Sequence, residues 1–265
     1  MHIKFYAKKS LGQNFLIDKE IAHKIPSLAS DISEKRILEI GPGFGSLTHS
    51  ILLQKPKYLF AIEKDHRFEQ PLLEIKKLNE NFNFQIGDAL DNFDYYTEKY
   101  SIIANLPYSV ATPLLLKWVY SSSLIEEIIV MVQKEVALRI TNTYQDAEYS
   151  RLSIITQTVY DSCICFDVAK ECFDPQPKVT SSVVYMKNNG KKYTEKFLQT
   201  LEIVTFHAFS QRRKKISNSL LLLFGNNTKA ILNDLGIDSQ KRAQDLSLND
   251  FHLLTRFSIE EKYDV

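Results

Sequence analysis

A four-residue run, Asn105-Leu106-Pro107-Tyr108, contains the residue types needed to hold an amino group of a nucleobase. The Asn105 side-chain oxygen can accept a hydrogen bond from an exocyclic amine. Pro107 fixes its own φ angle and leaves carbonyls free to point into a cleft. Tyr108 offers a flat face on which a base can stack. The same residues also suit an ordinary strand-end turn, so the run alone leaves both interpretations open.

The run from Asn105 to Tyr108 follows an apolar stretch, Ile102-Ile103-Ala104, which predicts a short buried strand. Similar apolar runs alternate with helical patterns through the first two thirds of the chain. Their β-branched and aromatic content predicts an α/β domain with an open, doubly wound, mostly parallel sheet, to which two later strands add an antiparallel edge pair. The expected strands are 36–40, 58–62, 84–87, 102–105, 128–132, 163–169 and 182–187, and the expected helices are 46–54, 66–79, 112–120 and 149–158.

A polar break at 188–192 is followed only by helical patterns. This change predicts a large domain at 1–190 and a small all-helical domain at 191–265. The helical patterns expected in the small domain are 194–223, 226–235 and 248–257.

A glycine-rich run and two carboxylates at three successive strand ends predict a pocket for an adenosine-containing cofactor. The glycine-rich run that begins at Gly41 opens a helix, and its glycines permit positive φ and close backbone approach. A dinucleotide fingerprint would need glycine where Ser46 stands, which disfavours NAD. Glu63 can accept hydrogen bonds from both ribose hydroxyls, and Asp88 can accept from the amino group of adenine. S-adenosylmethionine, which has no pyrophosphate, fits this pocket.

Composition excludes several classes of protein. The 265-residue chain is 44% hydrophobic and 25% charged, with a net charge of +1, so overall charge gives no argument for a nucleic-acid partner. The three cysteines lack metal-ligand spacing and are expected to be buried, reduced thiols. The basic start has no apolar segment typical of a secretory signal, and the longest apolar run is too short to span a bilayer. We therefore expect a soluble, cytoplasmic protein.

Motifs along nearly the whole chain resemble those of the small-subunit (16S-type) ribosomal RNA adenine dimethyltransferases. That family dimethylates N6 of two adjacent adenosines near the 3′ end of the RNA. No single motif decides the resemblance, but their order and spacing are specific. The matching segments are 8–16, 39–48, 87–90, 105–108 with 111–115, 133–139, 173–181, 211–215 and 242–247.

The resemblance implies a Rossmann-like S-adenosylmethionine-dependent methyltransferase domain with a seven-stranded sheet, and a helical domain that helps to hold RNA. The expected partner is small-subunit rRNA within a pre-30S-like particle, bound by a monomer without membrane attachment. The chain departs from the family pattern at Lys215, where Thr is usual, and at Gln244, where Glu is usual. Both departures bear on RNA docking. The cofactor contacts implied by matching position are Asn14, Leu16, Gly41, Glu63, Asp88 and Asn105.

The predicted mechanism is direct methyl transfer to the N6 nitrogen of adenine. If Asn105 and a carbonyl near Leu106 or Pro107 accept the two N6 protons, the nitrogen can pyramidalise and attack the sulfonium methyl. Tyr108 is expected to stack on one face of the flipped base, and Phe173 to cover the other, although core packing is the alternative for Phe173. Nothing in the motif implies a metal.

A basic run at 212–215 lies within a long helical pattern. Such a run is usually a solvated helix face. Beside a nucleic-acid-modifying site it predicts phosphate contacts by Arg212, Arg213 and Lys214, with Lys8 and Lys9 serving the same end near the cofactor pocket.

Three other functions compete with this interpretation. The 23S rRNA adenine-N6 methyltransferases of macrolide resistance share the amino-terminal and cofactor motifs, but they usually carry Ile where Leu106 stands and lack the Arg-Arg-Lys helix. A non-enzymatic ribosome assembly factor would not need the intact run from Asn105 to Tyr108. A nicotinamide dehydrogenase is disfavoured by Ser46 and by the lack of a plausible hydride-site His or Lys.

Overall fold

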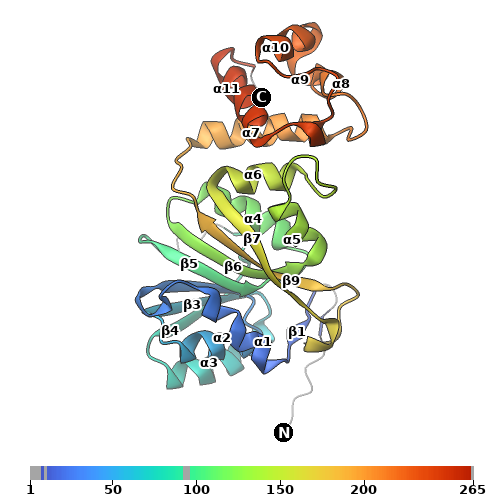
Figure 1. Cartoon of the computed structure of the whole chain (residues 1–265). Helices are drawn as coiled ribbons and strands as arrows, with labels where there is room; N and C mark the ends of the chain where they lie inside the picture. The colour runs from blue at the N-terminus through green and yellow to red at the C-terminus, as the bar shows by residue number, and fades with distance from the viewer. Residues whose placement is uncertain (1–6, 9–10, 92–95, 264–265) are drawn as a thin grey trace. The chain divides into compact units, whose positions relative to one another are not determined.

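The computed structural model describes residues 7–8, 11–91 and 96–263 (Figure 1). The chain divides into two compact units, one of Met1–Ala137 with Asp161–Asn188 and one of Leu138–Tyr160 with Asn189–Val265. The second part of the second unit begins at Asn189, next to the predicted domain boundary after residue 190. The sequence analysis placed Leu138–Tyr160 in the first domain. In the structure this segment belongs to the second unit, because its helix packs against the C-terminal helices.

The first unit is built on a seven-stranded sheet in the order β4-β3-β2-β5-β6-β9-β7 (Figure 1). The strands β4, β3, β2, β5 and β6 are paired in parallel, and β9 is antiparallel to β6. The predicted mostly parallel, Rossmann-like sheet is therefore confirmed. The bounds are β2 (Arg36–Ile40), β3 (Tyr58–Glu63), β4 (Phe82–Ile86), β5 (Tyr100–Asn105), β6 (Ile125–Gln133), β7 (Tyr160–Val168) and β9 (Ser181–Asn188).

The central strands are apolar along their length because both of their faces are buried. In β5, Ile103 belongs to the same core cluster as Leu47 and Ile51, while Ile102 and Ala104, which point to the opposite face, are also fully buried. The helices of this unit are α1 (Lys19–Lys24), α2 (Ser46–Leu53), α3 (Glu69–Leu78) and α4 (Ala111–Tyr120), and α5 (Lys134–Thr141) crosses into the second unit.

A second, two-stranded sheet lay outside the sequence prediction. It pairs β1 (Phe15–Leu16) antiparallel with β8 (Phe173–Asp174), and Leu16 lies opposite Phe173. Each strand is only two residues long, too short to show the alternation by which strands are predicted. This pairing ties the N-terminal segment of the chain to the loop that carries Phe173.

The second unit is helical, but its basic run is not. The predicted helix over 194–223 is wrong: α7 (Glu195–Phe209) ends before Arg212, and α8 (Ile216–Ser219) and α9 (Leu221–Phe224) follow a turn. In the turn the Lys214 N–H donates to the Gln211 carbonyl at 2.8 Å, and the Ile216 N–H donates to the Lys241 carbonyl at 2.7 Å. These bonds replace the helical ladder. The remaining helices are α6 (Arg151–Val159), α10 (Thr228–Asp234) and α11 (Leu248–Glu260).

The structure also bears on the expected lack of membrane-spanning segments and on the expected state of the cysteines. Across the part of the chain that is described, no helix is both long and apolar enough to cross a membrane. The three cysteines are free thiols, as predicted, but the prediction that they are buried is wrong: Cys163 is exposed on β7, and Cys165 and Cys172 are only partly buried.

Candidate active site

A cavity of about 340 Å³ lies at the carboxyl ends of the parallel strands. Its walls come from segment 11–17, the loop after β2, the ends of β3 and β4, and the loop after β5. Parallel strands bring their carboxyl ends to one edge of a sheet, so residues distant in sequence meet there. All six predicted cofactor contacts line this cavity, as do Leu106, Pro107 and Tyr108.

Glu63, the last residue of β3, is held by two backbone N–H groups. Its Oε2 accepts from Gly43 at 2.9 Å and its Oε1 accepts from Asp65 at 2.8 Å. The side chain is only 5% exposed, and this burial raises the pKa of the carboxyl group, although both backbone bonds oppose the rise. Each oxygen keeps a lone pair for a ligand hydroxyl. Gly43 reaches Glu63 with a φ of 56°, a conformation that favours glycine.

Asp88, which follows β4, is an ionised acceptor beside a cation. Its Oδ2 is 2.5 Å from the Lys64 Nζ, and its Oδ1 accepts from the Leu90 N–H at 3.0 Å. The hydrogen bond from Lys64 lowers the pKa of the Asp88 carboxyl group. Both Lys64 and Asp88 line the cavity.

Asn105 ends β5 with its side-chain amide fixed. The Asn105 Nδ2 donates to the Asn14 carbonyl at 3.3 Å. Because the amide oxygen lies opposite the nitrogen, this bond leaves the oxygen available to accept from a ligand. The Leu106 N–H donates to the Met131 carbonyl at 3.1 Å, and the Tyr108 hydroxyl is bonded to Ser181 Oγ at 2.7 Å. The Pro107 carbonyl accepts from the Val110 N–H at 3.1 Å, so each of the four residues is held by a hydrogen bond.

Phe173 is placed differently from the prediction. Its side chain is 2% exposed, belongs to the core cluster that contains Leu16, and does not line the cavity. The pairing of Leu16 with Phe173 between β1 and β8 accounts for this burial. In this structure Phe173 is thus a core residue, the alternative that the sequence had left open.

The predicted RNA contacts belong to both units of the chain. Arg212, Arg213 and Lys214 are exposed in the turn after α7, where Arg212 donates to the Ala147 carbonyl. The Lys8 ammonium is paired with Asp65 at 3.3 Å. Lys9 lies outside the described residues.

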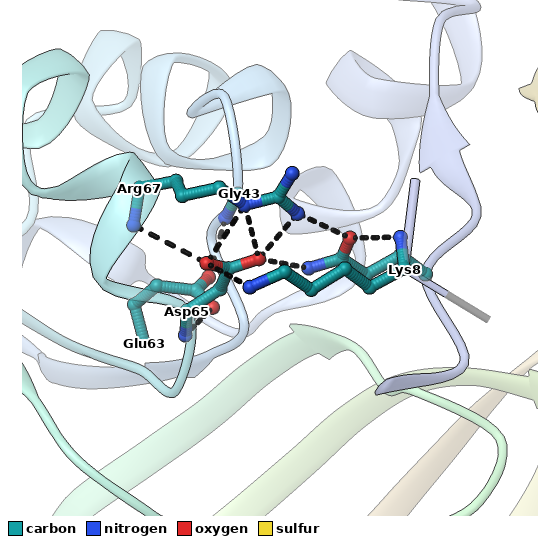
Figure 2. A network of polar contacts seen from close by, with 6 residues as sticks. Lys8, Gly43, Glu63, Asp65 and Arg67 are labelled. Atoms are coloured by element: carbon teal, nitrogen blue, oxygen red, sulfur yellow. Dashed lines mark hydrogen bonds and ion pairs between the residues drawn. The ribbon is translucent and has the colours of Figure 1, made fainter. Parts of the chain in front are cut away.

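Sequence reasoning missed a polar network beside the cavity, formed by Lys8, Gln13, Asp65 and Arg67 (Figure 2). It also missed Glu39, a cavity-lining carboxyl group whose burial raises its pKa to about 8. Gln13 lay within a motif segment and Asp65 lies two residues after Glu63, but neither position by itself predicts that the two side chains meet.

A family model described as ribosomal RNA adenine dimethylase matches residues 4–260. The chain belongs to the ribosomal RNA adenine dimethylase family. The predicted family and enzyme class are therefore confirmed, and a nicotinamide dehydrogenase is excluded.

Members of this family resemble the chain over almost its whole length. Ribosomal RNA small subunit methyltransferase A of Bartonella henselae is 40% identical over 262 residues, which cover 96% of this chain and 93% of that protein. The protein of the same name from Ehrlichia canis is 39% identical over 257 residues, which cover 94% and 95%. The chain therefore matches these small-subunit methyltransferases over nearly their whole length.

Solved structures agree with the fold. A dimethyladenosine transferase from Plasmodium falciparum superposes with a TM-score of 0.80 and 25% identity, covering 93% of this chain and 98% of that one. The 23S rRNA methyltransferase ErmE superposes with a TM-score of 0.69, covering 92% and 98%, but at 22% identity it supports the fold alone.

Proposed function

We propose that this dimethylase-family chain transfers methyl groups from S-adenosylmethionine to N6 of two adjacent adenosines in the 3′-terminal hairpin loop of small-subunit rRNA. The reaction takes place in the cytoplasm, on a pre-30S-like particle, with the enzyme as a monomer. The observation that carries the proposal is that Asn105, whose amide nitrogen is bonded to Asn14, lines one cavity together with the acceptors Glu63 and Asp88. Such a cavity has acceptors both for an adenosine cofactor and for an amine to be methylated.

The residues of the cavity fit S-adenosylmethionine. Glu63 is suited to hold the ribose hydroxyls, and Asp88 to hold the amino group of the adenine. Asn14, Leu16 and Gly41 complete the predicted contacts. When bound, this cofactor supplies an electrophilic methyl group on a sulfonium. Within the described residues, no cluster of three or more His, Cys, Asp or Glu side chains is arranged to hold a metal ion.

The chain activates the target nitrogen by accepting hydrogen bonds from its two N–H groups, which keep their protons until the methyl group has been transferred. The Asn105 oxygen accepts a hydrogen bond from one N6–H of the flipped adenine, and a backbone carbonyl accepts a hydrogen bond from the other. The Leu106 carbonyl suits this second role better, because the Pro107 carbonyl already accepts from the Val110 N–H at 3.1 Å. These hydrogen bonds hold both N6 protons out of the ring plane, so the nitrogen becomes pyramidal. Its lone pair is then no longer delocalised into the ring and can attack the methyl group. The extra proton leaves N6 after the methyl group has been transferred.

Tyr108 provides the stacking surface for the base. Its ring is half-buried and its hydroxyl is tethered to Ser181, so the ring orientation is set before RNA binds. RNA outside the cavity would be held by Arg212, Arg213 and Lys214, whose exposed charges can neutralise phosphates. Lys215 is bonded to Gln240 and is a weaker candidate.

The decisive experiment compares the wild-type protein with Asn105→Ala in two measurements. The first is calorimetric binding of S-adenosylmethionine, and the second is transfer of labelled methyl groups onto unmethylated small ribosomal subunits. We expect the dissociation constant to change by less than about threefold and the transfer rate to fall by about 100-fold or more, since the lost contact is made to the reacting amine.

Large ribosomal subunits serve as the matched control substrate, and the modified base is mapped to dimethyladenosine. Full activity of Asn105→Ala would refute the assigned role. Transfer onto large subunits by the wild type would favour the 23S reaction. Binding to small subunits without any transfer would favour an assembly factor.

A further inference from the structure

Asp65 is a buried carboxylate that accepts hydrogen bonds from three different side chains (Figure 2). The Arg67 Nη2 and Nε donate to its Oδ2 at 2.6 and 3.0 Å, and the Gln13 Nε2 donates to the same oxygen at 3.0 Å. The Lys8 Nζ lies 3.3 Å from Oδ1. These bonds, those from Arg67 first, hold the pKa of the Asp65 carboxyl group well below its usual range. Asp65 is therefore ionised throughout the physiological pH range.

Gln13 connects this carboxylate to the wall of the cavity. Its Oε1 accepts from the Lys8 N–H at 2.8 Å and from the Arg67 Nη2 at 3.3 Å, while its Nε2 is bonded to Asp65. Both ends of the Gln13 amide are thus fixed. Gln13 lines the cavity, but Lys8, Asp65 and Arg67 do not.

Asn14 and Glu63, which flank this network, are both proposed to contact the cofactor. Asn14, the residue after Gln13, provides the carbonyl that orients the Asn105 amide. On the other side, the Asp65 backbone N–H donates to Glu63 Oε1 at 2.8 Å. The Asp65 backbone therefore contacts Glu63, the proposed acceptor for the ribose hydroxyls. The Asp65 side chain contacts Gln13, which lies next to the Asn14 that is bonded to Asn105.

We propose that Asp65 is a positioning residue, which fixes the N-terminal wall of the cavity over the cofactor and thereby aligns Asn105 for methyl transfer. This inference rests on the proposed function of the cavity. A carboxylate is required because one neutral group could not pair with two cations and also accept from Gln13. Small displacements of a positioning group are sufficient to slow transfer between two bound reactants.

A purely structural role has to be separated from this one. The Asp65 side chain also accepts from the Arg67 N–H at 3.2 Å, as the N-cap of the short helix His66–Phe68. Asparagine caps helices about as well as aspartate. Asp65→Asn therefore keeps the helix cap and removes the negative charge. It also places an NH₂ group, which can only donate, next to the donors of Lys8, Gln13 and Arg67. A purely capping role predicts no effect of this variant on the cavity.

The test measures three quantities in Asp65→Asn, Lys8→Met and the double variant. These are hydrogen exchange of amides in 11–16, the rate of S-adenosylmethionine release by stopped flow, and single-turnover methyl transfer. We expect faster exchange, release accelerated by about tenfold, and transfer slowed by about tenfold in each single variant. The double variant should resemble Asp65→Asn rather than multiply the two effects, because both substitutions break the same ion pair.

Glu74→Gln is the matched control. It also removes one carboxylate from an ion pair, Glu74–Lys77 at 2.7 Å on α3, but it should leave all three measurements at wild-type values. If Asp65→Asn does not fold, Lys8→Met tests the same contact from its exposed side. Unchanged exchange and release in the folded variants, or multiplicative effects in the double variant, would overturn the positioning role. Failure of the wild type to bind S-adenosylmethionine would instead overturn the proposed function, and the exchange measurement would still test the network.

Discussion

The Asn105 side-chain amide donates to the backbone carbonyl of Asn14 at 3.3 Å, across 91 residues of sequence. The bond orients the amide before any ligand is bound. It also assigns the two ends of the side chain, since the nitrogen faces the protein and the oxygen is left for an amine. An asparagine at this position therefore differs from an aspartate, although the two have nearly the same shape.

Asn105→Asp should be nearly as damaging as complete truncation of the side chain. The carboxylate cannot donate to the Asn14 carbonyl, and repulsion between the two oxygens turns the side chain away from its present orientation. We expect methyl transfer to small subunits to fall by about 100-fold, with little change in thermal stability. Single-turnover assays and a melting curve check this. Activity within about threefold of the wild type would show that the donor function of Asn105 is dispensable.

Tyr108→Phe and Tyr108→Leu should separate the tether from the stacking face. Tyr108→Phe removes the bond to Ser181 Oγ, a loss of about 1 kcal/mol in stability, but keeps the ring. Tyr108→Leu also removes the stacking surface, so we expect kcat/KM for RNA to fall by a further tenfold or more. Ser181→Ala breaks the same tether and should match Tyr108→Phe. Equal kcat/KM values for the Phe and Leu variants would exclude stacking on Tyr108.

The strand ends that line the cavity could be predicted from sequence because their signals are local. The runs before Glu63 and Asn105 consist mainly of aliphatic and aromatic residues, and parallel pairing places the polar residue after each run at one edge of the sheet. No knowledge of distant contacts was needed to place Gly41, Glu63, Asp88 and Asn105 together.

The features that were missed or misplaced depend on pairing between distant segments. The burial of Phe173 follows from a two-residue strand that pairs with Leu16, and the Asp65 network joins side chains 52 and 57 residues apart. The basic turn was mistaken for helix because Arg, Lys and Gln favour helices intrinsically. There the Ile216 N–H bonds to Lys241, a tertiary contact that local preference cannot reveal.

Gly45→Ala should destabilise the first unit through a steric clash as well as backbone strain. Gly45 has a φ of 85°, and an added Cβ would overlap with Cδ1 of Ile75, which is buried. We expect a loss of about 2–4 kcal/mol, since strain and overpacking add. Gly236→Ala is the control, because its φ is 71° but nothing lies within 4 Å of the added Cβ. That variant should lose about 1 kcal/mol in urea denaturation, and equal losses in the two variants would exclude the clash.

The stability of the protein should depend on pH through Glu39, whose carboxyl group is 1% exposed. Burial raises its pKa from 4.5 to about 8, against the hydrogen bond from Thr48 at 2.8 Å, and the charge of Glu63 adds to the rise. Between these two values the folded state binds more protons than the unfolded state. The stabilising contribution is therefore complete below about pH 4.5 and is lost as the pH rises through about 8.

In Glu39→Gln the side chain is neutral in both the folded and the unfolded state, so this substitution should remove the contribution of residue 39 to the pH dependence of stability. The unfolding free energy of the wild type minus that of Glu39→Gln should fall between pH 5 and 8, by more than about 1 kcal/mol, and then level off. Urea denaturation at constant ionic strength measures this difference and cancels the groups that both proteins share. Thr48→Val removes the donor that lowers the Glu39 pKa, so in that background the fall should extend to higher pH. A difference that does not vary with pH would show that Glu39 has the same pKa in the folded and unfolded states.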